Sequence, residues 1–127
     1  MVAAIKRVII PDLRSRGFRG SLPHFRRQDT THVDLLSIQF SRWGGEFVVE
    51  VARAPSEGVT LGSGKFIPPS QLNAHHVLRR LRLGAADMNS DHWFKFDDAT
   101  TTSDFDRVAS EVPPLIATQA ESFRGDA

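Results

Sequence analysis

Two neighbouring runs, each with three apolar residues at alternate positions, constrain the fold of this chain more than any other feature. The first run spans residues 32–40 and the second spans residues 46–53. In the second run, Phe47, Val49 and Val51 fall on one face of an extended strand. The five residues between the runs end in two glycines, which adopt positive φ angles at little cost. The sequence therefore predicts a β-hairpin.

Shorter extended segments are expected on both sides of this hairpin. Residues 24–28 follow a predicted turn, and residues 77–83 and 93–97 are further candidate strands, because apolar and aromatic residues lie between turn-forming flanks. Residues 54–76 are rich in glycine and proline. A connection of this length is typical of a binding loop or of a segment with short structure of its own.

Helical periodicity replaces the alternation at the two ends of the chain. Residues 2–16 carry an apolar residue every three or four positions, and Pro11 predicts a kink or the start of a new helical turn. Residues 105–123 have the same spacing, and Thr101 or Ser103 is expected to cap this second helix. Two consecutive prolines predict that it is divided or sharply bent.

The order of these elements predicts an α+β fold. Consecutive strands between two helical ends favour an antiparallel sheet of four to five strands with the N-terminal and C-terminal helices packed on it. The length of 127 residues fits a single domain over residues 1–127. The tail after about residue 123 is expected to be frayed.

The two ends of the chain differ in charge. Residues 1–27 hold seven basic side chains and one acid, whereas residues 84–127 hold nine acids and three basic side chains. Packing of these two segments against each other neutralises both. We favour this interpretation over a nucleic-acid surface, because a dedicated nucleic-acid-binding domain carries a basic excess overall and the net charge here is only +1.

Composition and spacing exclude several kinds of site. The chain lacks cysteine, which excludes disulfides, thiolate metal sites and cysteine nucleophiles. No two of the five histidines have the i, i+4 spacing of zinc hydrolases, and no Gly-x-Ser-x-Gly motif occurs. We therefore expect no metal and no other cofactor, and we favour a non-catalytic role while leaving enzymatic activity open.

Membrane insertion and secretion are not expected either. No apolar run approaches the roughly 20 residues of a membrane span. Lys6 and Arg7 interrupt the first ten residues, so these do not resemble a signal peptide. The sequence predicts a cytoplasmic location.

Arginine is the most informative polar residue, because the chain has thirteen arginines and only three lysines. Arg80 and Arg82 share one side of the predicted strand 77–83. Guanidinium groups bind phosphate and carboxylate through paired hydrogen bonds, so these two predict an anion-binding face together with Arg26, Arg27 and Arg42. The alternative is that the arginines pair across the sheet with Asp34, Glu46 and Glu50.

Trp43 lies at the tip of the predicted hairpin. An exposed tryptophan there is typical of a contact anchor, whereas one folded back would cover the core, and both alternatives stay open. The candidate binding residues are therefore Arg26, Arg42, Trp43, Arg80, Arg82 and Trp93.

Several short motifs follow one another in a distinctive order: Gly17-Phe18, His24-Phe25-Arg26, the loop and its flanks from Gln39 to Phe47, Arg82-Leu83-Gly84, and Asp91-His92-Trp93-Phe94. In this order, from about Ile5 to Ile116, the chain resembles the bacterial domain of unknown function 4304 family. Its most specific part is the hairpin loop, where serine, arginine and an aromatic residue precede two glycines. The resemblance implies a small bacterial α+β domain and brings with it no reaction, cofactor or catalytic residue.

We therefore expect a non-catalytic binding or interaction domain that uses the hairpin tip, the arginine face and the 54–76 segment. The alternative function is a pocket for a small molecule or phosphate-type anion on the arginine-lined sheet face, with or without hydrolytic chemistry. The expected partner is a protein or a small anionic ligand, and a homodimer is a further alternative. Nucleic-acid binding through residues 1–27 is the least favoured interpretation.

Overall fold

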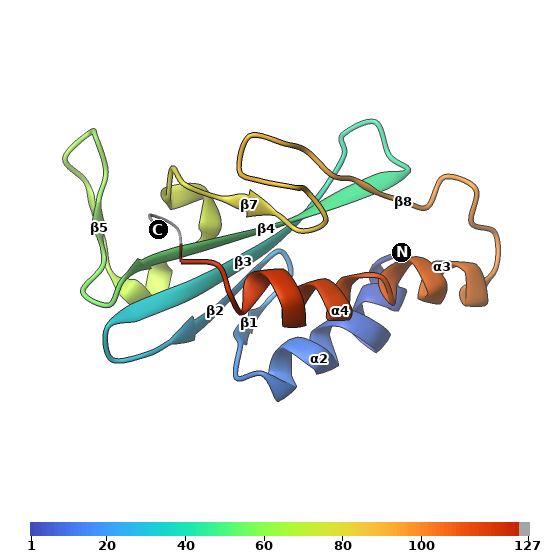
Figure 1. The fold of residues 1–127 in the computed structure, drawn as a ribbon, viewed down its shortest axis with the longest axis horizontal. Helices are drawn as coiled ribbons and strands as arrows, with labels where there is room; N and C mark the ends of the chain where they lie inside the picture. The colour runs from blue at the N-terminus through green and yellow to red at the C-terminus, as the bar shows by residue number, and fades with distance from the viewer. Residues whose placement is uncertain (125–127) are drawn as a thin grey trace.

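A six-stranded antiparallel sheet forms one layer of the computed structural model, which describes residues 1–124, and helices form the other (Figure 1). The strands follow the order β1-β2-β3-β4-β7, and β8 also pairs with β4. Their bounds are β1 (Arg19–Ser21), β2 (His24–Gln28), β3 (His32–Phe40), β4 (Glu46–Pro55), β7 (Leu81–Arg82) and β8 (Phe94–Lys95). The α+β class is confirmed, and the strand count exceeds the expected four to five because β1 forms just before the turn that leads into β2.

The long hairpin of β3 and β4 is present as predicted. Its register pairs Phe40 with Phe47 at the loop end and His32 with Pro55 at the other end. The backbone N–H of Ser41 donates to the Glu46 carbonyl at 2.9 Å and closes the loop. Gly44 and Gly45 both have φ of +79°, a conformation that a residue with a side chain rarely adopts.

The two predicted strands at 77–83 and 93–97 are each reduced to two residues. Only Leu81 and Arg82 form β7, and only Phe94 and Lys95 form β8. Before β7 the chain turns away from β4, because Val77 packs against a second apolar cluster on the other face of the sheet. Leu78 is left 98% exposed. The longer strand predicted at 77–83 was therefore wrong.

The N-terminal helix runs from Val2 to Ser15 through α1 (Val2–Ala4), the π-helical turn η1 (Ile5–Ile9) and α2 (Ile10–Ser15). The Ile10 N–H donates to the Ile5 carbonyl, five residues back instead of four. This wider turn directly precedes Pro11, which has no N–H and crowds the preceding turn of a regular helix. Of the two alternatives at Pro11, the structure has a new helical turn.

The C-terminal helical region is divided as the prolines predict, into α3 (Thr102–Ala109), α4 (Val112–Leu115) and the π-helical turn η4 (Ile116–Ala120). Thr101 caps α3, since its hydroxyl accepts from the Asp104 N–H at 3.1 Å while Asp104 accepts from the backbone of Thr101. The backbone N–H groups of Thr100 and Thr101 also hold the pKa of Asp104 well below its usual value. Fraying is expected after residue 123, but residues 125–127 of this tail lie outside the described part of the chain.

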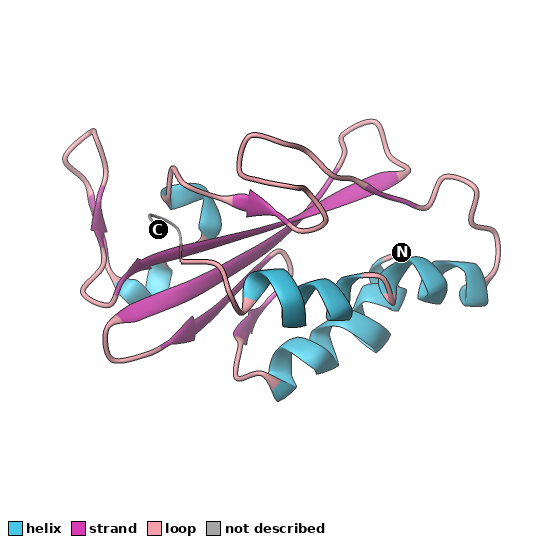
Figure 2. Cartoon of the chain, in the orientation of Figure 1, coloured by secondary structure: helices cyan, strands magenta, loops and turns pink. Residues whose placement is uncertain are grey.

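The N-terminal and C-terminal helices lie side by side on one face of the sheet (Figure 2). They bury the main core, whose largest fully buried members include Phe25, Phe47, Phe94, Ile5, Ile9 and Leu13. Arg7 and Asp106 pair at 2.7 Å, and Arg27 and Glu121 pair at 2.9 Å. The basic and acidic ends therefore pack against each other, and these two ion pairs join them.

The 54–76 segment has short structure of its own and covers part of the other face of the sheet. It contains β5 (Val59–Thr60), β6 (Phe66–Ile67), η2 (Pro69–Gln71) and η3 (Ala74–His76), and β5 pairs with β6 as a separate two-stranded ribbon. This covering buries a second, smaller core of Val33, Leu35, Ala52, Ala54, Ile67, Leu72 and Ala74. The segment therefore forms a wall beside the end of β4.

Candidate functional site

Arg80 and Arg82 lie on the face of the sheet opposite the helices, on either side of a buried carboxylate. The Glu50 side chain in β4 is 9% exposed, and its oxygen Oε2 lies 3.7 Å from Arg80 Nε and 3.6 Å from Arg82 Nε. These two guanidinium groups are therefore paired across the sheet, as the alternative interpretation of the sequence proposed.

Trp93 belongs to the same end of the sheet as Arg82. The Arg82 guanidinium carbon lies 5.3 Å from the centre of the Trp93 ring, and Arg82 also pairs with Asp91. The Trp93 indole N–H donates to Asp91 at 3.0 Å. Arg82 is thus held by two acids and one aromatic ring.

The other three candidate residues lie apart from this group. Arg42 and Trp43 occupy the tip of the hairpin, where the Arg42 guanidinium lies 4.7 Å from the Trp43 ring centre. Trp43 is 83% exposed, so it does not cover the core. Arg26 is half-buried in β2 opposite Leu35. The six candidate residues therefore do not converge on one site.

A cavity of about 860 Å³ lies where the chain separates from β4 before β7 begins. One side is formed by Arg53, Ala54 and Pro55 at the end of β4, and the opposite side by the separated segment 77–79. The ribbon residues 59–62 close a third side. Ligand cavities of small proteins span roughly 300–1,000 Å³, so the size suits a small ligand.

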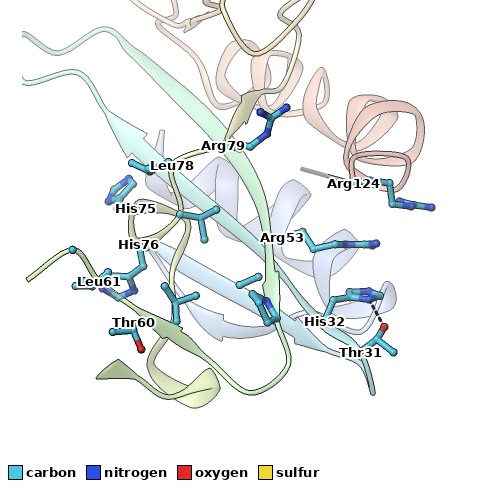
Figure 3. A pocket seen from close by; sticks show the side chains of 15 residues that line it. Thr31, His32, Arg53, Thr60, Leu61, His75, His76, Leu78, Arg79 and Arg124 are labelled. Atoms are coloured by element: carbon cyan, nitrogen blue, oxygen red, sulfur yellow. Dashed lines mark hydrogen bonds between the residues drawn. The ribbon is translucent and has the colours of Figure 1, made fainter. Parts of the chain in front are cut away.

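Every titratable side chain that lines this cavity in the described part of the chain is basic. Figure 3 shows His32, Arg53 and Arg124 toward one side and His75 and His76 toward the other. The remaining basic lining residue is Arg79, and the other walls are mostly apolar. The cavity thus combines a hydrophobic surface with an excess of hydrogen-bond donors.

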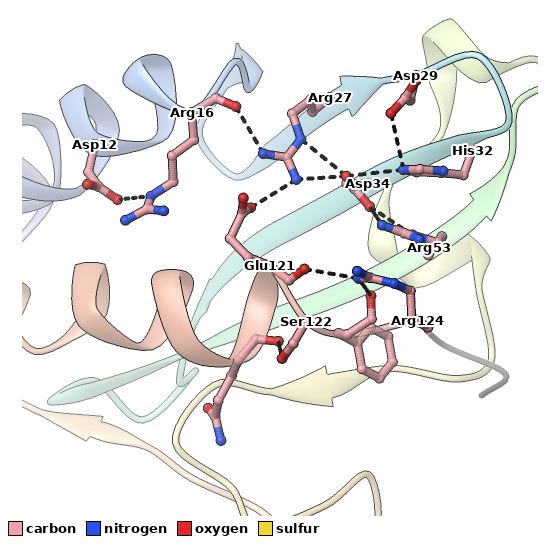
Figure 4. A network of polar contacts seen from close by, with 12 residues as sticks. Asp12, Arg16, Arg27, Asp29, His32, Asp34, Arg53, Glu121, Ser122 and Arg124 are labelled. Carbon is pink, nitrogen blue, oxygen red and sulfur yellow. Dashed lines mark hydrogen bonds and ion pairs between the residues drawn. The ribbon is translucent and has the colours of Figure 1, made fainter.

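A network of ion pairs holds Arg53 in place beside the cavity (Figure 4). The Asp34 carboxylate accepts from Arg53 Nε at 3.0 Å and from Arg27 at 2.8 Å, and His32 Nε2 lies 3.6 Å away. Arg27 extends the network to Glu121 of the C-terminal region. Asp34 lies behind the cavity wall, so it orients Arg53 without lining the cavity.

A serine and a histidine on the sheet have the distance of a nucleophile and its base but are not accessible to a substrate. Ser37 Oγ and His24 Nδ1 are 2.8 Å apart, in neighbouring strands. Ser37 is 1% exposed, and the His75 ring on η3 covers the His24 ring with a centre-to-centre distance of 5.4 Å. Burial lowers the pKa of His24, and the nearby His75 and His76 lower it further. This pair stabilises the sheet as a partly buried hydrogen bond.

The lowered pKa of His24 predicts a specific pH dependence. Because the folded protein holds the proton of His24 less tightly than the unfolded chain, this histidine contributes stability above its ordinary pKa of 6.5 and loses it as the pH falls below that value. The variant His24→Gln lacks this contribution. Urea unfolding between about pH 7.5 and pH 5 is expected to show a steeper loss of stability for the wild type than for the variant. Parallel curves would contradict this assignment.

The sequence did not identify the cavity residues as a group. They come from five separate segments, and they meet only because pairing with β4 begins at Leu81, which leaves residues 77–80 separated from β4. The one usable signal was the expectation that residues 54–76 form a binding loop or short structure, since this segment supplies the ribbon and both adjacent histidines.

Residues 1–124 contain no helix that is both long and apolar enough to cross a membrane. Within the same residues, no cluster of three or more histidine and acidic side chains has the arrangement of a metal site.

Comparison with known proteins gives one result. No curated protein and no solved structure matches the chain significantly. The family described as "Domain of unknown function (DUF4304)" matches residues 9–123, which is nearly the whole chain and includes the hairpin, the ribbon and, apart from Arg124, the residues that line the cavity. The chain therefore belongs to the DUF4304 family.

Proposed function

We propose that this protein is a non-catalytic binding domain whose cavity between β4 and residues 77–79 takes an organic anion. One observation carries the proposal: among residues 1–124, six basic side chains and no acid line a cavity whose other walls are mostly apolar. A carboxylate or phosphate that enters it meets guanidinium and imidazole donors, while the rest of the ligand contacts apolar surface.

Preorganisation supports this role. Asp34 fixes the Arg53 guanidinium, whose side chain is only 20% exposed, before any ligand arrives. A donor that is already oriented loses little conformational entropy when it binds, which favours affinity. The proposal keeps the anionic ligand expected from the sequence and places it beside Arg53 and Arg79, away from Arg80 and Arg82.

Two fluorescent probes that differ in charge test this function. Anilinonaphthalene sulfonate carries an anionic group on an apolar body, and phenylnaphthylamine is its neutral counterpart. We expect the sulfonate to bind the folded protein about tenfold more tightly, with an affinity that falls as salt is added, because the cavity supplies charged donors. Equal affinities for the two probes would overturn the proposal.

Neighbouring arginines provide a matched pair of variants for the same titration. Arg79 lines the cavity, whereas Arg80 pairs with Glu50 outside it. Arg79→Gln is expected to weaken sulfonate binding about fivefold, and Arg80→Gln less than twofold. Thermal unfolding of both variants confirms that they are folded. If the two variants weaken binding equally, the anion does not occupy this cavity.

The hairpin tip supports a second contact surface, for a protein partner. The observation that favours it is the exposed Trp43, which projects from the loop under Arg42. Large exposed aromatic residues next to arginine are typical of interface anchors. In a Trp93→Phe variant, which leaves one tryptophan, we expect emission typical of solvent-exposed indole and ready quenching by acrylamide. Blue-shifted emission that resists the quencher would remove the tip as a contact surface.

A further inference from the structure

We infer that the ligand of the cavity is an extended acidic segment of another protein, which adds to the sheet at the free edge of β4. This inference rests on the proposed function, since it names the class of anion that the cavity takes. Three observations support it: the direction of the backbone N–H and C=O groups of β4, the side-chain pattern around the cavity and the basic charge of the residues that line it.

The backbone of Arg53 points into the gap beside β4. In an antiparallel strand the N–H and C=O groups of successive residues point alternately to the two sides. The Glu46 carbonyl accepts from the β3 side, from Ser41, whereas the carbonyls of Gly45 and Val49 accept from the opposite side, from Phe96 and Leu83, each at 2.8 Å. Odd-numbered residues of β4 therefore point away from β3, and Arg53 is one of them.

No strand in residues 1–124 pairs with β4 at Arg53 on that side. The register of β4 with β7 covers only Glu50 with Arg82 and Val51 with Leu81. If this register continued for two more residues along β4, Arg79 would lie opposite Arg53. Arg79 lines the cavity instead, so the hydrogen-bonding edge at Arg53 opens into the cavity. A peptide that adds there continues the ladder that β7 begins.

Side-chain alternation defines which residues the added segment presents to each face. A residue paired with Arg53 has its side chain on the same face as Arg53, toward the basic group that includes Arg124 and His32. The residues before and after it point to the other face, where Ala54 packs with Val59, Leu61 and Val77. The preferred segment is therefore an acidic residue flanked by two apolar residues, and these three residues span about 10 Å.

Synthetic peptides test the mode of binding. The probe is the pentapeptide acetyl-Ser-Val-Asp-Val-Ser-amide, compared with acetyl-aspartic acid amide, which offers the same carboxylate without neighbours. We expect the pentapeptide to bind at least tenfold more tightly by calorimetry. Methylation of the aspartate backbone nitrogen, which removes the N–H that faces Arg53, is expected to weaken binding more than tenfold. Methylation of the following valine nitrogen, which points away from β4, is expected to weaken it less than threefold.

Hydrogen exchange provides a readout on the protein itself. On addition of the pentapeptide, the exchange of the Arg53 amide is expected to slow, whereas that of Ala54, which points to β3, stays unchanged. If both methylated peptides bind alike, or if Arg53 exchange does not slow, the strand addition is refuted. If sulfonate binding still depends on Arg79, the proposed function stands without the strand addition. If the sulfonate and its neutral counterpart bind with equal affinity, the proposed function is refuted as well.

Discussion

Replacement of Asp34 by asparagine is expected to lower the free energy of unfolding by about 2–3 kcal/mol. The Asp34 side chain is 14% exposed and joins Arg27, Arg53 and His32 from three strands. Asparagine has the same shape but no charge, and its amide N–H groups cannot accept from the guanidinium groups. Two half-buried cations would then lie close together without their shared anion, which is the costly arrangement in a region of low dielectric constant.

The measurement is urea unfolding followed by circular dichroism, with Asp12→Asn as the matched control. Asp12 also pairs with an arginine, Arg16, at 2.8 Å, but the two lie one helical turn apart at the end of α2, and no second cation in residues 1–124 pairs with Asp12. Its replacement is expected to cost about 0.5 kcal/mol or less. Equal losses in the two variants would show that the network around Asp34 contributes no more than an ordinary helical ion pair.

Replacement of Phe47 by alanine is expected to cost more, about 3–5 kcal/mol. Phe47 is fully buried, and its ring stacks on Phe94 with centres 5.2 Å apart. Its centre also lies 5.9 Å from that of Phe40 and 6.2 Å from that of Phe96. Removal of the ring leaves a cavity in the main core and takes away the aromatic contacts that hold the short strand β8 on the sheet.

Trp43→Ala is the control on the same hairpin, four residues earlier. It removes a larger side chain, but this side chain is 83% exposed, so we expect a change within about 0.5 kcal/mol. Thermal and urea unfolding of both variants measure the difference. If Trp43→Ala destabilises the protein as much as Phe47→Ala does, Trp43 is part of the packed structure, and the proposed contact surface at the hairpin tip is wrong.

Elements whose determinants are local could be predicted from the sequence. The hairpin follows from side-chain alternation together with two glycines at the loop, and both occur within a few residues of each other. The start of α3 follows from the spacing of Thr101 and Asp104, and the division of the C-terminal helix follows from consecutive prolines. In each case the residues that determine the structure are also the residues that adopt it.

Elements that depend on distant contacts could not be predicted. Nothing within residues 77–83 shows that Val77 packs on the second core or that pairing with β4 begins only at Leu81. The cavity forms because residues 77–80 do not pair with β4, so the residues that line it could not be predicted from the sequence either. Arg80 and Arg82 showed the correct alternation, but only the position of Glu50 across the sheet determines that they pair with it. The binding roles proposed for the six residues selected from the sequence stay predictions.

The pairing of the two ends of the chain has a consequence for the order of assembly during synthesis. The hairpin and the N-terminal helix become available early, and they can pack on each other while the ribosome still adds the later residues. The cover supplied by Ala109, Val112 and Ile116 is synthesised only after the hairpin and the strands that follow it. Until then, the sheet surface beside Phe47 lacks part of its apolar cover, so the nascent chain passes through a period in which chaperones, or another nascent chain, can reach that surface.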